Sequence, residues 1–354
     1  MTLNVELLRD LTQTPGIASR EDEIRAVTAT HLRPLVDDLS VDPMGNLIGV
    51  RTGEGGPRVA IVAHIDEIGF LVRHVDDQGY IRLQRVGGFD PRVLPAQRVR
   101  VRTRSGDVLP GVLQPGTKPI HLLQAGEAKD LKLEDMYVDV GLPAETVKER
   151  VRLGDMVTLD RELVEIGDTL VSKAMDDRVG VFVMIEAIRA ATTRKAEVIA
   201  IASTQEEVGL RGAHAAAYSI EPDVTIALDV TIAADIPGTP GDTAVTKLGA
   251  GAAIKVLDSS QISNPKLVDH LRDLAEQHQI PVQDEILPFG GNDGGAFQSS
   301  RGGRAVATIS IPCRYVHTVN EMVHVADVEA CISLLAAFLD AAGERSYGFE
   351  VPEA

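Results

Sequence analysis

Short apolar runs recur along most of the chain. The run RVAIVAHID at 58–66 is rich in β-branched residues, which predicts a strand buried on both faces of a sheet. Later apolar runs predict further strands at 197–204, 225–230 and 305–312. Since such strands pair in parallel through helical crossovers, the pattern predicts an α/β domain with a parallel sheet.

Helical periodicity appears between and around these runs. Apolar residues at roughly helical spacing predict a helix near 20–36, and Ser19 with Asp22 forms the expected N-cap signature. Further helices are expected from Asp177 onward, near 264–278 and over 326–342. Strands and helices therefore alternate on both sides of the middle of the chain.

The pattern changes between Gly69 and Asp160. Segments such as VRVRTRSGDVLPGVL alternate in character, carry Gly-Asp and Pro-Gly turns and show little helical periodicity. We therefore predict a small β-rich domain at 68–164. It is inserted into a larger α/β domain made of residues 1–67 and 165–354.

Composition narrows the class of partner and compartment. The 52 acidic and 35 basic side chains give a net charge of -17, which opposes extended contact with nucleic acid or an anionic membrane. The two cysteines, Cys313 and Cys331, favour a reducing compartment and are expected in the core. The first residues lack the basic and apolar regions of a signal peptide, so a cytoplasmic protein is expected.

Titratable residues collect where the predicted strands end or a helix begins. In a sheet of this kind ligands bind at the carboxyl ends of the strands. The residues in these positions are His64, Asp66, Asp176, Asp177, Glu206, Glu207, Asp229 and His317. Histidines and carboxylates without a thiolate favour divalent ions such as Zn, Co or Mn. Because crowded acids raise one another's pKa, two such ions are expected rather than one.

Each of these pieces has an ordinary structural explanation. A single His-x-Asp at a strand end is more often a local hydrogen bond, and Asp-Asp before a helix often only complements the helix dipole. Adjacent glutamates usually form a solvated turn. The hypothesis of a metal site depends on all the groups facing one crevice, where Asp66 would orient the His64 ring.

In order, the motifs VAHIDEIGF, KAMDDRVG, STQEEVGLRGA, ALDV, GGNDGGAF and IPCRYVHTVNEMV resemble those of the M42 family of metallo-aminopeptidases. The resemblance implies a zinc-peptidase-like α/β/α sandwich with an inserted β-barrel or PDZ-like dimerisation domain. It also implies a homo-oligomer, which in this family is often a tetrahedral dodecamer.

Matching these motifs residue by residue implies a role for each side chain. The metal ligands would be His64, Asp176, Glu207, Asp229 and His317. Asp176 would lie between two ions, Zn or Co, with His64 and Asp229 on opposite ions. Glu206 would be the general base, Asp66 would support catalysis, and a cis peptide bond is expected at Asp176-Asp177.

The implied reaction is hydrolysis of the N-terminal peptide bond of short peptides with a free amino terminus, with Glu206 activating the water between the ions. Two departures from the family pattern, the loop GGNDGG at 290–295 and Thr318, bear on substrate preference. The alternatives are an amidase or deacylase of small modified peptides, a glycoside hydrolase, and a non-catalytic scaffold. The chain has no Trp and only 3% aromatic residues, which disfavours an aromatic platform for binding a sugar.

Overall fold

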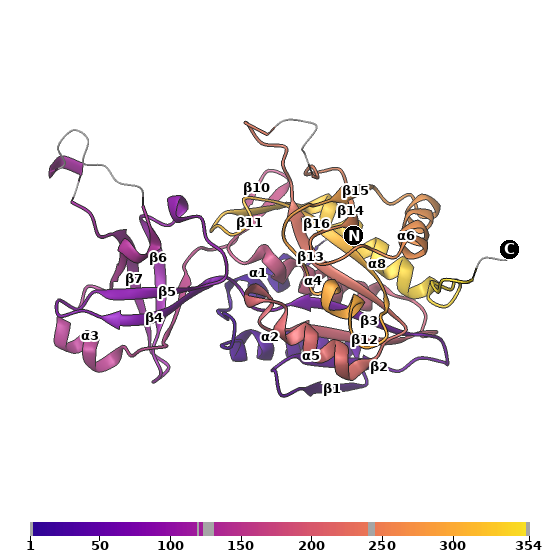
Figure 1. Cartoon of the computed structure of the whole chain (residues 1–354), viewed down its shortest axis with the longest axis horizontal. Helices are drawn as coiled ribbons and strands as arrows, with labels where there is room; N and C mark the ends of the chain where they lie inside the picture. Colours follow the sequence, from indigo (N-terminus) through magenta and orange to yellow (C-terminus); the bar gives the residue numbers. More distant parts are fainter. Residues whose placement is uncertain (1–2, 119, 123–130, 240–244, 352–354) are drawn as a thin grey trace.

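The computed structural model describes residues 3–118, 120–122, 131–239 and 245–351. The chain forms two lobes, a large α/β lobe that contains both termini and a smaller β-barrel lobe (Figure 1). Within the described residues no helix combines the length and apolar character needed to cross a bilayer. The prediction of an α/β fold with an inserted β-rich unit is confirmed.

The large lobe contains a mixed sheet of 11 described strands in the order β1-β2-β12-β3-β13-β16-β17-β11-β10, with β14 and β15 joined through β16. Its strands are β1 Asp38–Val41, β2 Leu47–Arg51, β3 Arg58–His64, β10 Val164–Ile166, β11 Thr169–Ser172, β12 Glu197–Ser203, β13 Val224–Ile232, β14 Ala252–Leu257, β15 Val282–Ile286, β16 Ala305–Arg314 and β17 Glu321–His324. The central strands β12, β3, β13 and β16 are parallel, as their apolar runs predicted.

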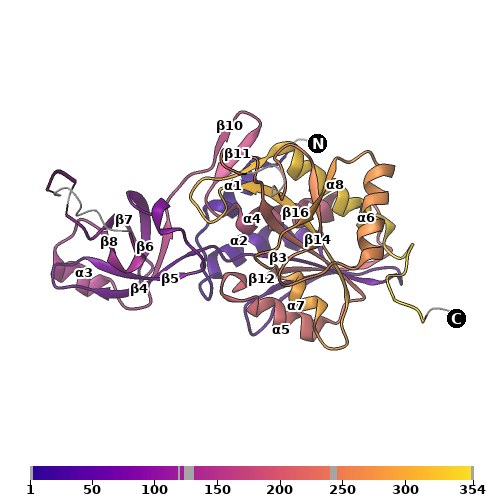
Figure 2. The same cartoon turned by 45° about the horizontal axis from the view of Figure 1, so that its top comes forward.

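Helices cover both faces of this sheet. They are α1 Val5–Gln13, α2 Asp22–Leu32, α4 Met175–Ala190, α5 Arg211–Ile220, α6 Pro265–Gln277, α7 Gly294–Gln298 and α8 Val325–Ala341. In β3, Val59, Ile61 and Ala63 pack with α1, α4 and α8, whereas Ala60 and Val62 pack with α5 and α7. Figure 2 shows α5 and α7 below the sheet and α8 above it. Burial on both faces explains why this strand is apolar throughout.

The smaller lobe is a closed barrel of strands in the order β4-β5-β8-β7-β6-β9. Its elements are β4 Gly69–Val75, β5 Ile81–Val86, β6 Gln97–Arg102, β7 Val108–Pro115, β8 Met136–Asp139, β9 Met156–Leu159 and the helix α3 Ala144–Arg150. In β6 the buried Val99 and Val101 alternate with the exposed Arg98 and Arg100. This period of two is typical of strands with one face toward a core and the other toward solvent.

Short 3-10 helices occur at η1 Arg33–Leu35, η2 Pro91–Val93, η3 Ile120–Leu122, η4 Leu133–Asp135 and η5 Glu206–Val208. The predicted helix at 20–36 is thus divided into α2 and η1. The expected N-cap at Ser19 is wrong, because Ser19 has a left-handed φ of 71° and Glu21 precedes the helix without a side-chain cap. The Glu21 carboxylate instead accepts the Ser19 main-chain N–H at 2.8 Å.

Both cysteines are buried and free, as expected from the sequence. The predicted strands and helices of the α/β lobe are all present, with ends shifted by a few residues. The carboxyl ends of β3 and β12 lie level, since Ser203 pairs with His64. Strands β13 and β3 pair as far as Ala227 and Val62, two positions before Asp229 and His64. The sheet therefore brings the predicted site residues to one edge.

Candidate metal centre

Asp176 occupies the centre of the predicted cluster. It lies at the start of α4, where Asp176 and Asp177 have non-helical φ and ψ angles and are joined by the expected cis peptide bond. Its Oδ1 lies 3.1 Å from His64 Nε2, and its Oδ2 lies 3.3 Å from His317 Nε2. One carboxylate therefore faces two histidines that are 253 positions apart in the sequence.

His64, the last residue of β3, is almost fully buried and its ring is held by main-chain contact. Its Nδ1 lies 2.9 Å from the main-chain oxygen of Asp66, whereas the nearest Asp66 carboxylate oxygen is 3.6 Å away. The expectation that the Asp66 side chain orients the ring is therefore corrected: the carbonyl does so. With Nδ1–H donated to this carbonyl, Nε2 is the ring nitrogen that faces Asp176.

The buried Asp66 carboxylate has a different role. Its Oδ1 accepts the main-chain N–H of Glu206 at 3.0 Å, and its Oδ2 accepts that of Glu207 at 3.2 Å. Asp66 lies beyond His64, the last residue of β3, so the rule that residues i and i+2 of a strand point to the same face does not apply to this pair. Asp66 thus fixes the short helix η5 that carries both glutamates.

The two adjacent glutamates, which could not be told apart by spacing, face different histidines. Glu207 Oε2 lies 3.5 Å from His317 Nε2, and Glu206 Oε2 lies 3.8 Å from His64 Nε2. Both side chains line the same cleft. The interpretation of Glu206 and Glu207 as a merely solvated turn therefore does not hold for this structure.

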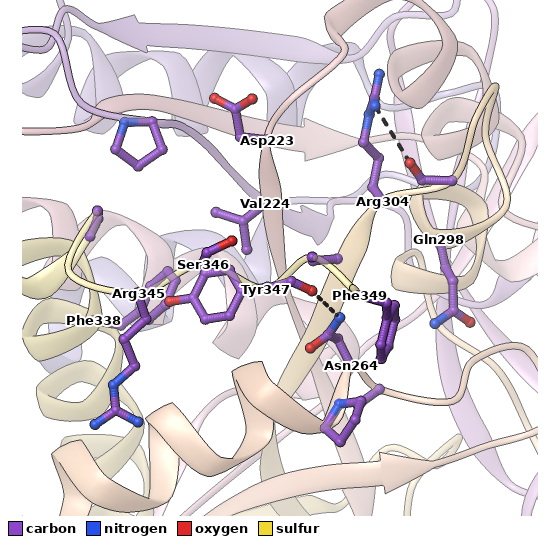
Figure 3. Close-up of a pocket in the computed structure, with 18 of the residues that line it drawn as sticks. Asp223, Val224, Asn264, Gln298, Arg304, Phe338, Arg345, Ser346, Tyr347 and Phe349 are labelled. Atoms are coloured by element: carbon purple, nitrogen blue, oxygen red, sulfur yellow. Dashed lines mark hydrogen bonds between the residues drawn. The ribbon is translucent and has the colours of Figure 1, made fainter. Parts of the chain in front are cut away.

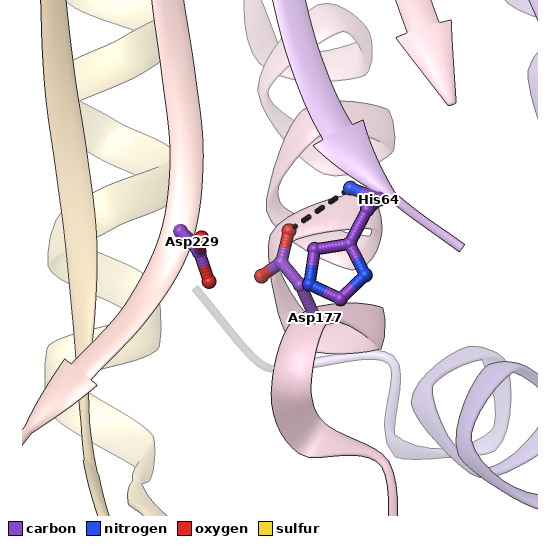
Figure 4. A group of neighbouring side chains, drawn as sticks. All are labelled: His64, Asp177 and Asp229. Carbon is purple, nitrogen blue, oxygen red and sulfur yellow. Dashed lines mark hydrogen bonds between the residues drawn. The ribbon is translucent and has the colours of Figure 1, made fainter. Parts of the chain in front are cut away.

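Asp229 and Asp177 form a second group with His64 (Figure 4). One potential ligand atom from each of the three residues lies within 4.8 Å of the others, and all three side chains are buried. Asp177 accepts main-chain N–H groups of His64 at 3.3 Å and Gly180 at 3.1 Å, so it anchors β3 to α4. Asp229 remains the carboxylate of this group that also borders the cleft.

The pKa values of two carboxylates and of both histidines of this cluster are raised, for different reasons. Burial, reinforced by neighbouring carboxylates, raises the pKa of Glu206 and Asp229 well above the ordinary range. Burial alone would lower the pKa of His64, but Asp176 and Asp66 raise it well above its usual value. Contacts with Asp176 and Glu207 likewise overcome burial and raise the pKa of His317 to about 12. Without cations, the cluster thus retains protons.

The site opens into a cleft of about 520 Å³. Asp176, Glu206, Glu207, Asp229 and His317 all line it. A larger cavity, of about 820 Å³, lies where β13 and β16 begin, at the opposite end of these parallel strands (Figure 3). None of the predicted site residues lines that cavity, so its size does not make it the reaction site.

Sequence reasoning did not identify Glu321, a buried residue at the start of β17. Its Oε2 accepts the Asp176 main-chain N–H at 3.1 Å, and its Oε1 accepts that of His317 at 2.7 Å. Its only signal in the sequence was its position four residues after His317.

A loop of the barrel also reaches the site, and no motif in the sequence indicated this contact. A Cβ added to Gly88 would lie 3.2 Å from His317 Nδ1, and one added to Gly87 would lie 3.1 Å from Glu207 Oε2. Gly88 lines the cleft. The inserted lobe therefore contributes one wall of the site, and glycines permit the close approach.

The GGNDGG loop lies beside the cleft, as expected for a loop near the substrate. Gly290 and Gly291 line the cleft, while Asn292 is buried and donates to Asp258 Oδ2 at 2.5 Å. Asp293 is also buried and accepts a hydrogen bond from Ser203 Oγ. Burial raises the pKa of Asp293 to about 6. Thr318 donates to the Tyr315 carbonyl at 2.7 Å and belongs to the turn that carries His317.

Comparison with known proteins places this site in a family context. Residues 45–334 match the family described as M42 glutamyl aminopeptidase. The lysyl aminopeptidase of Pyrococcus furiosus is 35% identical, and the alignment covers 95% of this chain and 96% of that protein.

Two solved structures are similar over nearly their entire length. The aminopeptidase APDkam598 of Desulfurococcus kamchatkensis superposes with a TM-score of 0.91 at 38% identity, covering 97% of this chain and 95% of that one. The TET1 peptidase of Pyrococcus horikoshii, described as assembling into a tetrahedron or a large octahedral shell, gives a TM-score of 0.84 at 32% identity, with coverage of 94% and 98%.

Proposed function

The chain belongs to the M42 peptidase family and is a peptide-bond hydrolase, and from this premise we propose that it is an aminopeptidase that uses two divalent metal ions. The observation that carries the proposal is the position of Asp176. Its two carboxylate oxygens face two different histidines, and further carboxylates lie on either side. Such a set of nitrogen and oxygen donors suits Zn or Co.

We assign the ligands by proximity. His64 and Asp229 would hold one ion, His317 and Glu207 the other, and Asp176 would contribute one oxygen to each. This assignment differs from the expectation that places His64 and Asp229 on opposite ions, and it is supported by ligand atoms of these two residues that lie within 4.8 Å of each other. Without cations, the buried carboxylates would repel one another, which supports the presence of two ions.

Glu206 is the acid in the cleft that this assignment leaves free. Divalent ions bound at such a site polarise the scissile carbonyl and lower the pKa of water. Glu206 would take a proton from the attacking water and transfer it to the leaving amine nitrogen as the C–N bond breaks. The hydrogen bond between Asp66 and the Glu206 main-chain N–H holds this side chain at the cleft. The role of Asp66 in catalysis is therefore one of positioning.

The proposed substrates are short peptides with a free amino terminus. Relatives of similar length are named aminopeptidases, which supports this substrate class. We further propose a homo-oligomer in which the barrel lobe provides a contact between copies, supported by the assemblies described for the TET1 peptidase. A metal-dependent amidase or deacylase remains the second candidate, because the GGND loop beside the cleft departs from the family pattern.

The deciding experiment compares wild type with Glu206→Gln on aminoacyl anilides, with metal content measured in parallel. Loss of turnover by a factor of about 10² to 10⁴ with two ions still bound is expected. Glu344→Gln, a change at an exposed residue that follows α8, serves as the control. EDTA should abolish activity, and N-acetylated peptides should not be cleaved. Near-normal turnover by Glu206→Gln contradicts the role of Glu206, and faster cleavage of acylated substrates favours the amidase.

A further inference from the structure

The wall of the cleft beside Asp229 contains a buried ammonium group. Lys255 of β14 lines the cleft and is 2% exposed. It lies close enough to Asp229 to lower the pKa of that carboxyl, although burial dominates and the net shift is upward. Among the described residues, Lys255 is the only lysine or arginine that lines the cleft.

Two buried carboxylates already neutralise Lys255. Its Nζ lies 2.7 Å from Glu285 Oε1 and 3.3 Å from Asp258 Oδ2, and both carboxylates are 0% exposed. Burial alone would lower the pKa of Lys255, but these partners raise it, so the ammonium stays charged. One cation facing two anions leaves one negative charge in excess.

The geometry of this triad is fixed from several segments. Glu285 Oε1 also accepts Thr231 Oγ1 at 2.7 Å, and Thr231 itself lines the cleft. Asp258 Oδ2 accepts a hydrogen bond from the side-chain amide of Asn292. Asn292 belongs to the GGNDGG loop and directly follows the two glycines that line the cleft. Glu285 Oε2 is buried without a hydrogen-bond partner among the described residues, so no further donor offsets its charge. Lys255 therefore cannot swing freely toward a ligand.

From this arrangement we propose that the triad Lys255, Glu285 and Asp258 determines substrate preference, disfavouring peptides with an acidic N-terminal residue and accepting neutral or basic ones. The inference rests on the proposed aminopeptidase function. An acidic side chain beside this wall would meet a cation whose charge is already balanced, together with an excess negative charge. Repulsion in a partly desolvated cleft is weakly screened by salt.

The test compares glutamyl with glutaminyl and methionyl p-nitroanilides, which are similar in length and differ in charge. For the wild type, kcat/KM should be at least about tenfold higher for the neutral substrates. Glu285→Gln leaves Lys255 with one carboxylate and should shrink this ratio by about tenfold. Adding Lys255→Met to Glu285→Gln should restore the wild-type ratio, since the freed cation is then absent.

Asp284→Asn is the matched control. It removes the same formal charge from the neighbouring residue of β15, but this side chain is 60% exposed and pairs with Arg272. If Glu285 has only a structural role, Glu285→Gln will lower stability and leave the substrate ratio unchanged, as Asp284→Asn does. That result overturns the proposal.

The outcomes separate this inference from the proposed function. A wild type that cleaves the glutamyl substrate as fast as the glutaminyl one overturns the role of the triad but leaves the aminopeptidase intact. A folded, metal-loaded wild type that cleaves none of the anilides overturns the function itself. If Glu285→Gln does not fold, Asp258→Asn removes the other carboxylate that pairs with Lys255, and it should shrink the ratio in the same way.

Discussion

The Glu321 carboxylate accepts the main-chain N–H of His317 at 2.7 Å, and this bond fixes a residue with a left-handed φ of 63°. Its other oxygen accepts the Asp176 N–H at 3.1 Å. Glu321→Ala would leave two N–H groups without their acceptor, at a cost of about 1 to 3 kcal/mol each if they remain buried. We expect the affinity for at least one metal ion to fall about 10- to 100-fold, measured by calorimetric titration of the metal-free protein.

Glu321→Gln should have an intermediate effect, because its amide keeps one acceptor oxygen and turns a donor toward the other N–H group. Glu344→Ala, at an exposed residue, is the control. Metal binding by Glu321→Ala with wild-type stoichiometry and affinity would show that the contact is not needed for positioning.

Asp66→Asn tests whether the Asp66 carboxylate positions the two glutamates of η5. An amide can accept only one of the N–H groups of Glu206 and Glu207 that the carboxylate now accepts. We expect kcat on an aminoacyl anilide to fall about 10- to 100-fold, with a smaller change in KM. Thermal unfolding should also show a loss of about 1 to 3 kcal/mol.

Asp327→Asn provides a close match for this variant. Asp327 is buried and accepts the N–H groups of Gly249 and Gly251, one on each oxygen, but it does not line the cleft. It should lose comparable stability and keep its kcat. Equal losses of kcat in the two variants would assign Asp66 a purely structural role.

Gly87→Ala tests the contact between the barrel loop and the site. Gly87 has φ of +86°, and an added Cβ would lie 2.6 Å from Ile68 Cγ2 and 3.1 Å from Glu207 Oε2. The backbone cost is about 1 to 2 kcal/mol, and the clash should displace the loop from the cleft. We expect kcat/KM to fall at least tenfold in anilide assays.

Gly106→Ala separates backbone strain from the clash. Gly106 has φ of +91° in the barrel, and nothing lies within 4 Å of its added Cβ. Stability should fall in both variants, but activity should fall only in Gly87→Ala. A similar loss of activity in Gly106→Ala would mean that general weakening of the barrel, rather than the contact with Glu207, is responsible.

Metal binding should release protons. In the metal-free protein the pKa of His317 is about 12 and that of His64 is well above its usual value, so both rings are charged at pH 7. Metal binding requires neutral imidazole, so at least two protons should leave at pH 7 and affinity should fall as the pH is lowered. Calorimetry in buffers of different ionisation enthalpy measures this number. Binding without proton release would contradict the assignment of both histidines as ligands.

Much of the fold could be predicted from local patterns. The apolar strands β3, β12, β13 and β16 were recognised because burial on both faces leaves a continuous apolar run. The β-rich character of the inserted domain was recognised from alternation, as in β6, whereas its barrel form was implied only by the family resemblance. The Ser19 cap failed because a local signature does not reveal that Glu21 has taken the Ser19 N–H.

The candidate site could be predicted only as a set of residues. The expected five ligands and Glu206 do converge, but spacing could not show that Glu206 faces His64 and Glu207 faces His317. Nor could it separate Asp177, which anchors main-chain groups, from its neighbour Asp176.

The sequence by itself determined that acids and histidines follow buried strands, because a buried strand is recognisable as an apolar run and the residues after it are adjacent in the chain. Only the tertiary structure decided that Gly87 of the barrel approaches Glu207, that Glu321 holds His317, and that Glu285 neutralises Lys255. These relationships depend on distances of a few ångströms between segments that lie on separate elements. Such distances are set by how the layers pack, which no local pattern of residues records.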